Sequence, residues 1–439
     1  MDVVVTRIAS LQGALTMPAD KAIGHRAALL CAVAAGSTEI RPWPPGDDCQ
    51  QTLALLQQLG VNIARRGDGV RIDGVGLTGL RAPRADLDCG ESGTTMRLAA
   101  GLLAGQPFVS RLTAGDSLRR RPMRRILEPL SRMGARCDGS PSAHGDLCPP
   151  LVIEGRRPLN GVTHVMATAS AQVKSAILLA GLYAEEPTVL TEPVATRDHT
   201  ERMLRRLGLS LTASGQTLTL LPPRGEIAPP GQLVIPGDPS SAAFFITAAA
   251  LLPGSTLTIR DVSLNPSRVR FLEVLRRMGA SIETRVEDEA WEPRGTVTVA
   301  SRPLRGVEVS ADEAPAVIDE LPILMVAACA AQGPSRFHGL QELRVKETDR
   351  LQSMISGLTA LGARIEAQGM ADLRIAPSRL HGGEVDSCRD HRTAMSLAIA
   401  GLLADGRTTI RGAECAQKSF GAFFDVLAAL VGPAHVQHG

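Results

Sequence analysis

Lysine is rare in this chain, and each lysine has polar neighbours that suggest chemistry. Of the 47 basic residues, four are lysine (Lys21, Lys174, Lys346 and Lys418) and the other 43 are arginine. Lysine offers a compact charge with three rotatable donors and a pKa that burial can shift, whereas arginine offers a planar, permanently charged fork. Each lysine lies in a short polar cluster, at the start of an apolar helical run or near another such cluster. The four are therefore candidates for binding and protonating a small anionic substrate.

Six polar clusters share one position, directly before a helical run rich in Ala and Leu. They are Asp20-Lys21 to His25-Arg26, residues 91–95 (ESGTT), 170–175 (SAQVKS), 238–241 (DPSS), Asp319-Glu320 and 390–392 (DHR). Ordinary N-capping accounts for the Asp and Ser residues of the 238–241 cluster. N-capping does not explain Lys21, Arg26, Gln172, Lys174 or Arg392. Cations near a helix N-terminus oppose the helix dipole, unless an anion sits between them and the exposed N–H groups.

Two further segments concentrate charge. Residues 344–350 (RVKETDR) hold three cations and two carboxylates, which favours a paired acid/base and anion-binding segment over a solvated surface helix. Residues 119–125 (RRRPMRR) hold five arginines, of which we expect most to face solvent and only one to be a ligand.

A repeating helix pattern indicates how these clusters are positioned. Six amphipathic runs each end in a hydrophobe followed by glycine, at Gly60, Gly134, Gly208, Gly279, Gly362 and Gly432. Glycine suits a helix C-cap, where a left-handed backbone is needed. Six other runs, which follow the polar clusters, are apolar nearly all round and should be buried. We therefore expect six units of roughly 70 residues, three in each of two similar domains; a solenoid is the alternative, but its repeats are usually shorter and need capping units.

Composition excludes several classes of function. At 439 residues the chain is too long for one core, and two domains, possibly three, fit that length. A net charge of +2 and 3% aromatic residues argue against nucleic-acid binding. We expect no membrane span, because the most apolar run, Ala242 to Leu252, is too short to cross a bilayer. The eight cysteines are scattered singly, which predicts reduced thiols in a cytoplasmic protein and no metal site. The GxGxxG match at residues 74–79 is not expected to bind a dinucleotide, since no helix should follow it.

Ten segments, in order, resemble the 5-enolpyruvylshikimate-3-phosphate (EPSP) synthase family over nearly the whole chain. They are PADKAIGHRA, CGESGTTMRL, GDSLRRRPM, SAQVKSAILLAGLYA, TRDHTERML, GDPSSAAFF, DELPILMVAA, RVKETDRL, DHRTAMSLAIAG and KSFGAFF. All four lysines fall within these segments. The resemblance implies a two-domain, inside-out α/β fold of six βαβαββ repeats, with the active site in the inter-domain cleft. It places residues 1–16 with 237–439 in one domain, holding repeats 4–6 and the N-terminal strand, and 17–236 in the other, holding repeats 1–3.

The resemblance also implies the reaction and its residues. The enolpyruvyl group of phosphoenolpyruvate would pass to the 5-hydroxyl of shikimate 3-phosphate, with phosphate released and no metal or organic cofactor needed. Residues expected to bind shikimate 3-phosphate are Lys21, Arg26, Ser170, Gln172, Arg197, Asp319 and Lys346. Residues expected to bind phosphoenolpyruvate are Lys21, Gly93, Arg121, Gln172, Arg350, Arg392 and Lys418. Lys21, Asp319 and Glu347 are the expected catalytic residues, with Glu347 and Lys21 as competing proton donors. For Lys174 a structural ion pair is the alternative to a substrate contact.

The chain departs from the family pattern at a few positions. Ala19, Ala22 and Gly24 stand in the first segment where the family carries Gly, Ser and Ser, and Glu91, Glu342 and Gly421 replace the usual Asn, a neutral polar residue and Pro. Losing the hydroxyl at Ala22 would cost roughly 1 kcal/mol. Gly93 leaves room beside phosphoenolpyruvate, which implies inhibition by glyphosate. A monomer that closes around its substrates is the expected form.

Three alternatives remain open on the sequence. Ala22 and Glu91 suit a paralogous enolpyruvyl transferase that acts on a different hydroxylated acid. An enolpyruvyl transferase acting on UDP-N-acetylglucosamine is a second alternative, because Asp116 precedes an Arg-Pro pair as in that family. A catalytically inactive binding domain is the third, although such a domain would be expected to lose its charged residues first.

Overall fold

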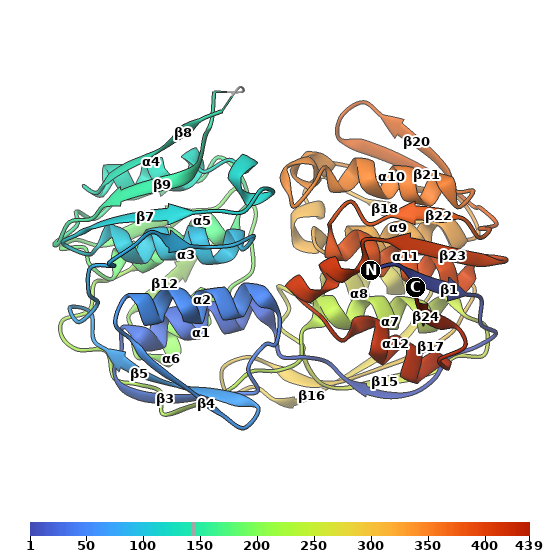
Figure 1. Ribbon diagram of the computed structural model, residues 1–439, viewed down its shortest axis with the longest axis horizontal. Coiled ribbons are helices and arrows are strands. Elements are labelled where there is room, and N and C mark those ends of the chain that lie inside the picture. Colours follow the sequence, from blue (N-terminus) through green and yellow to red (C-terminus); the bar gives the residue numbers. More distant parts are fainter. Residues whose placement is uncertain (143–144) are drawn as a thin grey trace. The chain divides into compact units, whose positions relative to one another are not determined.

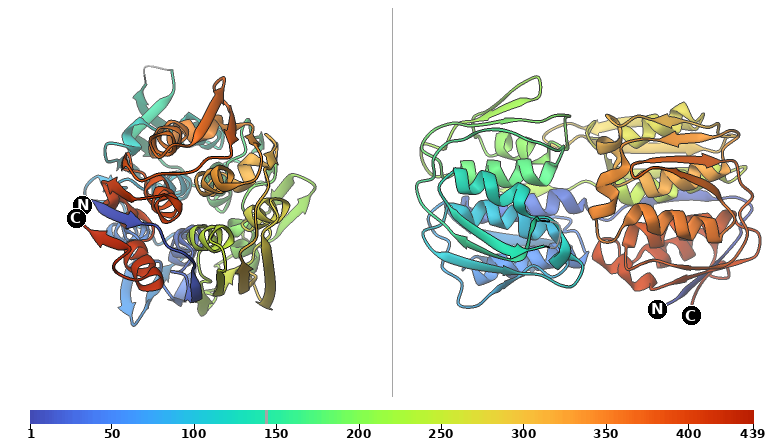
Figure 2. Two further views of the ribbon diagram at one scale, coloured as in Figure 1. Left: turned by 90° about the vertical axis from the view of Figure 1, so that its right-hand side faces the viewer. Right: turned by 90° about the horizontal axis from the view of Figure 1, so that it is seen from above.

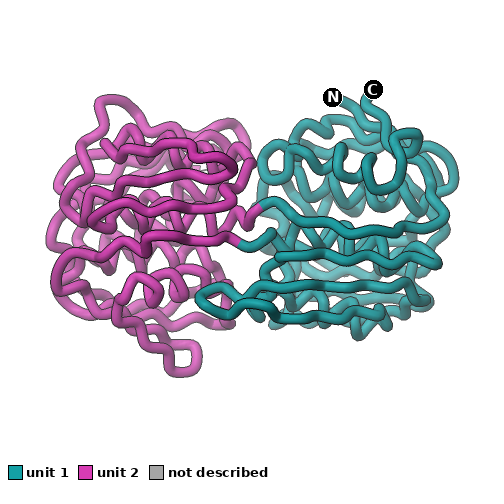
Figure 3. The backbone as a smooth tube through the Cα atoms, turned by 90° about the horizontal axis from the view of Figure 1, so that it is seen from below, with its two compact units in different colours: residues 1–18, 236–439 teal, residues 19–235 magenta. Residues whose placement is uncertain are grey.

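The chain forms two compact units, which Figure 3 shows in different colours. Unit 1 comprises Met1–Pro18 and Pro236–Gly439, and unit 2 comprises Ala19–Ile235. The computed structural model describes residues 1–142 and 145–439. Within these residues, each unit is built from three four-stranded sheets and six α-helices.

Every sheet has the same pairing, in which the first two strands are parallel and the remaining neighbours are antiparallel. The sheets of unit 2 are β14 (Gln232–Val234), β3 (Ala35–Arg41), β5 (Gly69–Val75) and β4 (Asn62–Arg66); β6 (Leu87–Asp88), β7 (Val109–Thr113), β9 (Leu147–Glu154) and β8 (Arg136–Pro141); and β10 (Thr163–Val165), β11 (Thr188–Thr191), β13 (Thr217–Leu220) and β12 (Leu211–Ser214). The sheets of unit 1 are β2 (Gln12–Thr16), β15 (Thr256–Ser263), β17 (Arg294–Ala300) and β16 (Ser281–Asp288); β18 (Glu308–Val309), β19 (Ser335–Phe337), β21 (Asp372–Ala376) and β20 (Arg364–Gln368); and β22 (Glu384–Asp386), β23 (Arg407–Arg411), β1 (Val3–Thr6) and β24 (Val436–His438).

The helices fall into the two predicted classes (Figure 1). The inner helices, which are buried on nearly all sides, are α1 (Lys21–Ala32), α3 (Gly93–Ala104), α5 (Ala171–Gly181), α7 (Pro239–Leu251), α9 (Leu321–Ala330) and α11 (His391–Leu403). The outer helices, which bury one face, are α2 (Asp47–Gln58), α4 (Arg124–Arg132), α6 (His199–Arg206), α8 (Arg270–Arg277), α10 (Arg350–Ala360) and α12 (Phe423–Val431).

The six closing glycines confirm the predicted repeat. Each follows an outer helix with a φ between 77° and 104°, in the left-handed region that glycine enters without steric cost. Strand, inner helix, strand, outer helix and two strands recur six times, which confirms the βαβαββ prediction. No helix follows Gly74–Gly79, where the chain continues without helix to β6.

Strands from distant parts of the chain complete three of the repeats. β2 leads into α1 of unit 2 but pairs with β15 of unit 1, and β14 leads into α7 of unit 1 but pairs with β3 of unit 2. In the last repeat, β1 lies between β23 and β24. The two chain ends therefore lie side by side in unit 1 (Figure 2).

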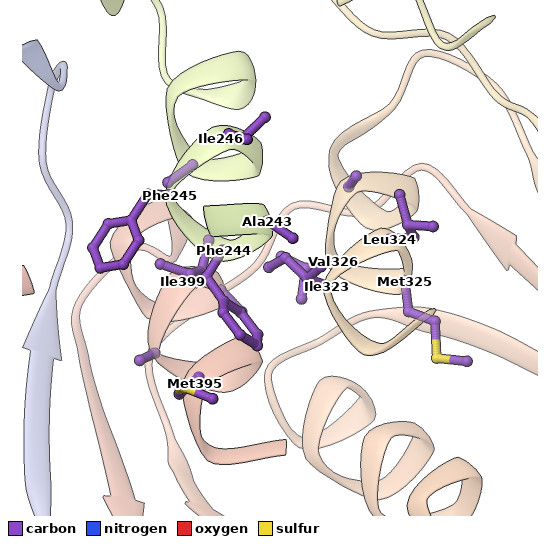
Figure 4. Close-up of a cluster of buried hydrophobic side chains, with 14 of the residues drawn as sticks. Ala243, Phe244, Phe245, Ile246, Ile323, Leu324, Met325, Val326, Met395 and Ile399 are labelled. Carbon is purple, nitrogen blue, oxygen red and sulfur yellow. The ribbon is translucent and has the colours of Figure 1, made fainter. Parts of the chain in front are cut away.

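The core of unit 1 is formed by inner helices packing on one another. Figure 4 shows Phe244 of α7, Ile323 of α9 and Met395 of α11 in this cluster, all at most 2% exposed. Phe244 also packs edge-on against Phe423 of α12, with ring centroids 5.7 Å apart. Because α7, α9 and α11 pack side by side, their first turns are fixed relative to each other. Within the described residues, no helix is long and apolar enough to cross a membrane.

Candidate active site

Side-chain caps fix the starts of the inner helices, as the N-capping interpretation predicts. Asp20, Ser92, Ser170, Asp238 and Asp390 each accept a hydrogen bond from a backbone N–H of the first turn. At α9, Glu320 instead accepts from the hydroxyl of Ser240 at the start of α7. Ser240 also accepts from buried Arg268 at 2.9 Å, so capping and packing account for the 238–241 cluster.

In unit 2, two arginines converge on the first residue of α3. A methyl group on Gly93 would lie 2.7 Å from Nη1 of Arg97 and 2.8 Å from Nη1 of Arg121. Arg97 donates to Oε1 of Gln172 at 2.7 Å, and Nε2 of Gln172 donates to Oγ1 of Thr94 at 2.9 Å. The structure therefore brings together Gly93, Arg121 and Gln172, which the sequence analysis predicted as site residues. It also places two guanidinium groups beside the N–H groups at the start of α3. Such a site favours a compact anion.

Arg97 is a residue that the sequence analysis missed. It is 4% exposed and lies one turn after Gly93 on a helix that is otherwise apolar. That single charge on an apolar helix, spaced four residues from the predicted Gly93, is the signal that could have revealed it.

The start of α1 carries two more predicted residues. Nζ of Lys21 lies 2.9 Å from Oδ2 of Asp48, on α2. Arg26 is buried, and it donates through Nε to Thr200 and through Nη2 to Ser175, both at 2.8 Å. These bonds tie α1 to α5 and α6 and fix the plane of the guanidinium group.

The last two predicted residues of unit 2 lie at the starts of α5 and α6. Ser170 is the N-cap of α5 and is partly exposed. Arg197 lies two residues before α6 and is also partly exposed. Of the five arginines in the 119–125 segment, Arg121 is 7% exposed and Arg125 is partly exposed, whereas Arg119, Arg120 and Arg124 face solvent. This confirms the expectation that most of them are solvent-facing.

In unit 1, Arg350 joins three carboxylates. Its Nε donates to Oδ2 of Asp390 at 2.8 Å, its Nη2 donates to Glu347, and its Nη1 lies 3.6 Å from Oδ1 of Asp319. Burial alone would lower the pKa of Arg350, but the three acids raise it well above its ordinary value. Arg392 contacts the same Asp319 at two points. Its Nη1 donates to the backbone carbonyl of Asp319 at 2.8 Å, and its Nη2 lies 3.4 Å from Oδ2 of the Asp319 carboxylate. The carboxylates of Asp319 and Glu347 are therefore oriented by buried guanidinium groups.

Lys346 and Lys418 are held near this network. Burial lowers the pKa of Lys346 to about 8, with Asp319 acting in the opposite direction. Lys418, at the end of η4 (Ala413–Lys418), donates from Nζ to the carbonyl of Arg389 at 3.0 Å, just before α11. All six predicted residues of unit 1 thus surround the starts of α9, α10 and α11.

Lys174 differs from the other three lysines, because it is fully buried. Its Nζ lies 2.9 Å from Glu192 and 2.6 Å from Glu201, and the three side chains are at most 6% exposed. Burial raises the pKa of Glu201, and Lys174 counters part of that rise. The structure favours the ion-pair alternative for this residue.

One departure from the family pattern has a steric cause. A side chain at Gly24 would meet Cγ of Pro44 at 2.5 Å, so helix α1 packs too closely there for serine. A side chain at Gly421 would meet the end of the flexible Gln417 side chain, which can move away, so that departure has no structural explanation. Ala22 has a structural contact of its own, since its carbonyl accepts from Nη1 of Arg26 at 2.8 Å.

Six such repeats, with charged residues at the starts of their inner helices, define a two-unit α/β fold suited to binding small anions. The model of the EPSP synthase (3-phosphoshikimate 1-carboxyvinyltransferase) family matches residues 5–427. The chain therefore belongs to the EPSP synthase family.

Individual relatives agree. A 3-phosphoshikimate 1-carboxyvinyltransferase of Roseiflexus sp. (strain RS-1) is 48% identical over 421 residues, covering 95% of this chain and 96% of the relative. The same enzyme of Bacillus cereus (strain B4264) is 43% identical over 418 residues, covering 95% and 96%. An EPSP synthase structure from Acinetobacter baumannii superposes with a TM-score of 0.86 at 38% identity, covering 99% of both chains. The enolpyruvyl transferase NikO from Streptomyces tendae shares the fold, with a TM-score of 0.77 at 21% identity, covering 100% of this chain and 98% of NikO.

Proposed function

We propose that the chain transfers the enolpyruvyl group of phosphoenolpyruvate to the 5-hydroxyl of shikimate 3-phosphate and releases phosphate. The observation that carries this proposal is the pair of guanidinium groups over Gly93. Arg97 and Arg121 converge there on the first turn of α3, which suits a phosphate group. Family membership supports the same reaction.

We assign shikimate 3-phosphate to groups whose charge and position match its phosphate, carboxylate and hydroxyls. Ser170 and Arg197 suit the 3-phosphate, and Arg26 suits the ring carboxylate because Ser175 and Thr200 hold its guanidinium group in place. The full assignment is Lys21, Arg26, Ser170, Gln172, Arg197, Asp319 and Lys346.

We assign phosphoenolpyruvate to a second group of residues. Arg121 and Lys418 suit its phosphate, and Arg350 and Arg392 suit its carboxylate as planar forks. The full assignment is Lys21, Gly93, Arg121, Gln172, Arg350, Arg392 and Lys418. Arg97 joins this group through its contact with Gln172.

The chemistry needs one proton removed and one delivered. The 5-oxygen attacks C2 of phosphoenolpyruvate as its proton passes to a base, while C3 gains a proton, giving a tetrahedral intermediate. Loss of a C3 proton then expels phosphate. Asp319 suits the base, oriented by Arg350 and Arg392, and Glu347 or Lys21 suits the donor to C3. Glu347 is paired with Arg350 and Lys21 with Asp48, so either proton transfer starts from a fixed position.

Replacement of Gly93 by alanine is expected to raise the KM for phosphoenolpyruvate by about ten- to a hundredfold. The new methyl group would displace Nη1 of Arg97 and of Arg121, which lie within 2.8 Å of its position. Such a loss corresponds to about 1.4–2.8 kcal/mol. Steady-state kinetics would measure it, with the affinity for shikimate 3-phosphate as the internal control. An equal loss for both substrates would contradict the assignment.

The dependence of kcat/KM on pH should reflect the protonation state of Lys346. Its neutral amine no longer attracts an anionic substrate, so kcat/KM for shikimate 3-phosphate should fall as pH rises through about 8. Burial and the nearby Arg350 lower the pKa of this lysine, and the carboxylates of Asp319, Glu342 and Glu347 oppose that fall. In Lys346→Arg the cation persists at high pH, so the alkaline decline should move upward or disappear. An unchanged decline in that variant would assign it to another group.

Three further properties are part of the proposal. Glyphosate should inhibit by competing at the phosphoenolpyruvate residues, and the active form should be a monomer. The protein should be cytoplasmic, which its eight unpaired cysteines support.

Phosphate release by the purified protein tests the proposed function. Release is expected only with both substrates present and should be lost in Lys21→Ala. Arg66→Ala, which removes an exposed cation from the same unit, is the matched control. No release, together with no rise in Tm on adding shikimate 3-phosphate, would mean that the chain uses another hydroxylated acid.

A further inference from the structure

Glu91, the carboxylate that replaces the usual Asn, is directed at protein backbone. It lies in the turn before α3, next to the N-cap Ser92. Its Oε2 accepts from the N–H groups of Ser117 at 3.1 Å and Leu118 at 2.9 Å. These two residues open the short η1 helix (Leu118–Arg120), which leads directly to Arg121.

The segment from Gly115 to Arg121 is attached to the same turn at a second point. The N–H of Gly115 donates to the carbonyl of Gly90 at 2.7 Å, and the N–H of Arg119 donates to the carbonyl of Gly115 at 2.9 Å. A side chain at Gly115 would lie 2.5 Å from Oε1 of Glu91. Gly115 has no positive φ, so its backbone would accept alanine, and the three atoms nearest to the new side chain all belong to Glu91.

This attachment determines where Arg121 lies. Cδ1 of Leu118 and Nη1 of Arg121 both approach the position of a side chain on Gly93, at 3.5 and 2.8 Å. The guanidinium group of Arg121 is therefore placed over α3 by a short segment, which Glu91 holds through two charge-assisted bonds. Bonds of this kind are stronger than neutral ones.

We propose that Glu91 is a positioning residue for phosphoenolpyruvate binding, acting through the Gly115–Arg121 segment and not on the substrate. This inference rests on the proposed function, which assigns Arg121 to phosphoenolpyruvate. It explains why a carboxylate is tolerated near an anionic substrate, since backbone N–H groups neutralise part of its charge. Because a side chain at Gly115 would overlap the Glu91 carboxylate, the effect of a substitution at Gly115 should depend on which residue stands at position 91.

Kinetics of Glu91 variants, run after the wild-type reaction has been established, test the proposal. Glu91→Ala should raise the KM for phosphoenolpyruvate roughly tenfold, equivalent to about 1.4 kcal/mol, and change the Kd of shikimate 3-phosphate by less than about twofold. Glu91→Gln keeps one acceptor oxygen and should restore part of the loss. Asp116→Ala, which removes an exposed carboxylate from the same segment, is the matched control and should change neither constant. An unchanged KM in Glu91→Ala, or an equal loss for both substrates, would overturn the proposal. An inactive wild-type protein would instead overturn the proposed function.

Gly115→Ala provides a second, independent arm. In the wild-type background its methyl group should displace Glu91 and raise the KM for phosphoenolpyruvate about as much as Glu91→Ala does. In the Glu91→Ala background it should add less than about twofold, because the obstructing carboxylate is gone. Effects that multiply in the double variant would show that Glu91 does not hold this segment.

Limited trypsin digestion of the substrate-free protein gives a readout apart from activity. Cleavage after Arg119 and Arg120, both exposed, should be faster in Glu91→Ala than in wild type. Cleavage after Arg66, exposed in the same unit, serves as the reference and should not change. Equal acceleration at both places would indicate general destabilisation and overturn the positioning role.

Discussion

Replacing Arg350 with alanine is expected to lower kcat/KM by roughly a thousandfold or more. Arg350 is 1% exposed and joins Asp319, Glu347 and Asp390, two of which are assigned to the proton transfers. Without it, three carboxylates face one another and the carboxylate fork for phosphoenolpyruvate is lost. Small misplacements of catalytic groups can alone cost about a hundredfold.

The same substitution should destabilise unit 1, so activity and stability must be measured separately. Removing one partner from a buried ionic network costs about 3–5 kcal/mol. Rates should therefore be taken well below the Tm of each variant. Arg350→Lys keeps the charge but not the planar fork, and it should recover more stability than activity. A variant that keeps kcat/KM within tenfold of wild type would show that Arg350 is structural only.

Replacing Lys174 with methionine should greatly reduce stability but change KM little, unlike the replacement of Arg350, which should reduce both stability and activity. The substitution leaves Glu192 and Glu201 buried without their cation. The expected cost is about 3–5 kcal/mol in the free energy of unfolding of unit 2. At about 2–4 °C per kcal/mol, this is a fall in Tm of roughly 10 °C, measurable by calorimetry.

The pH dependence of this loss has a defined sign. Burial already raises the pKa of Glu201, so the folded protein retains a proton at pH values where the unfolded chain has released it. The contribution of Glu201 to stability therefore falls as pH rises. The deficit of Lys174→Met should be larger at pH 8 than at pH 5, and adding Glu192→Gln and Glu201→Gln should reduce it. A fall in kcat without a fall in Tm would instead place Lys174 among the substrate ligands.

The sequence predicted those parts of the fold that depend on local pattern. The ends of the outer helices could be predicted from six glycines, because a left-handed C-cap conformation favours glycine at one position. Local pattern alone did not show which sheets β2 and β14 join, because strand pairing depends on contacts between distant segments; the family resemblance was needed to place residues 1–16 with residues 237–439. Placing the N-terminal segment as one strand missed its division into β1 and β2, which join different sheets.

The candidate site divides in the same way. Lys21 and Arg392 could be identified because a cation at the N-terminus of a helix opposes the helix dipole, which indicates that an anion binds there. For Arg97 the sequence offered only its isolated charge on an uncharged helix, because its partner Gln172 lies 75 residues away. The role of Glu91 left no local signal, since its partners are the backbone N–H groups of Ser117 and Leu118. The ion-pair role of Lys174 stayed one of two alternatives for the same reason, because Glu192 and Glu201 have no local relation to it.

The exchange of strands between the units sets the order in which the chain can fold during translation. Unit 2 is one continuous stretch, Ala19–Ile235, and everything it needs has left the ribosome before most of unit 1 is made. Residues 1–18 emerge earlier still, yet the partners of β1 and β2 are β23, β24 and β15. β2 must therefore stay unpaired until β15 has been made, and β1 until β23 and β24 have been made. Their short length, four residues in β1 and five in β2, limits aggregation during that interval.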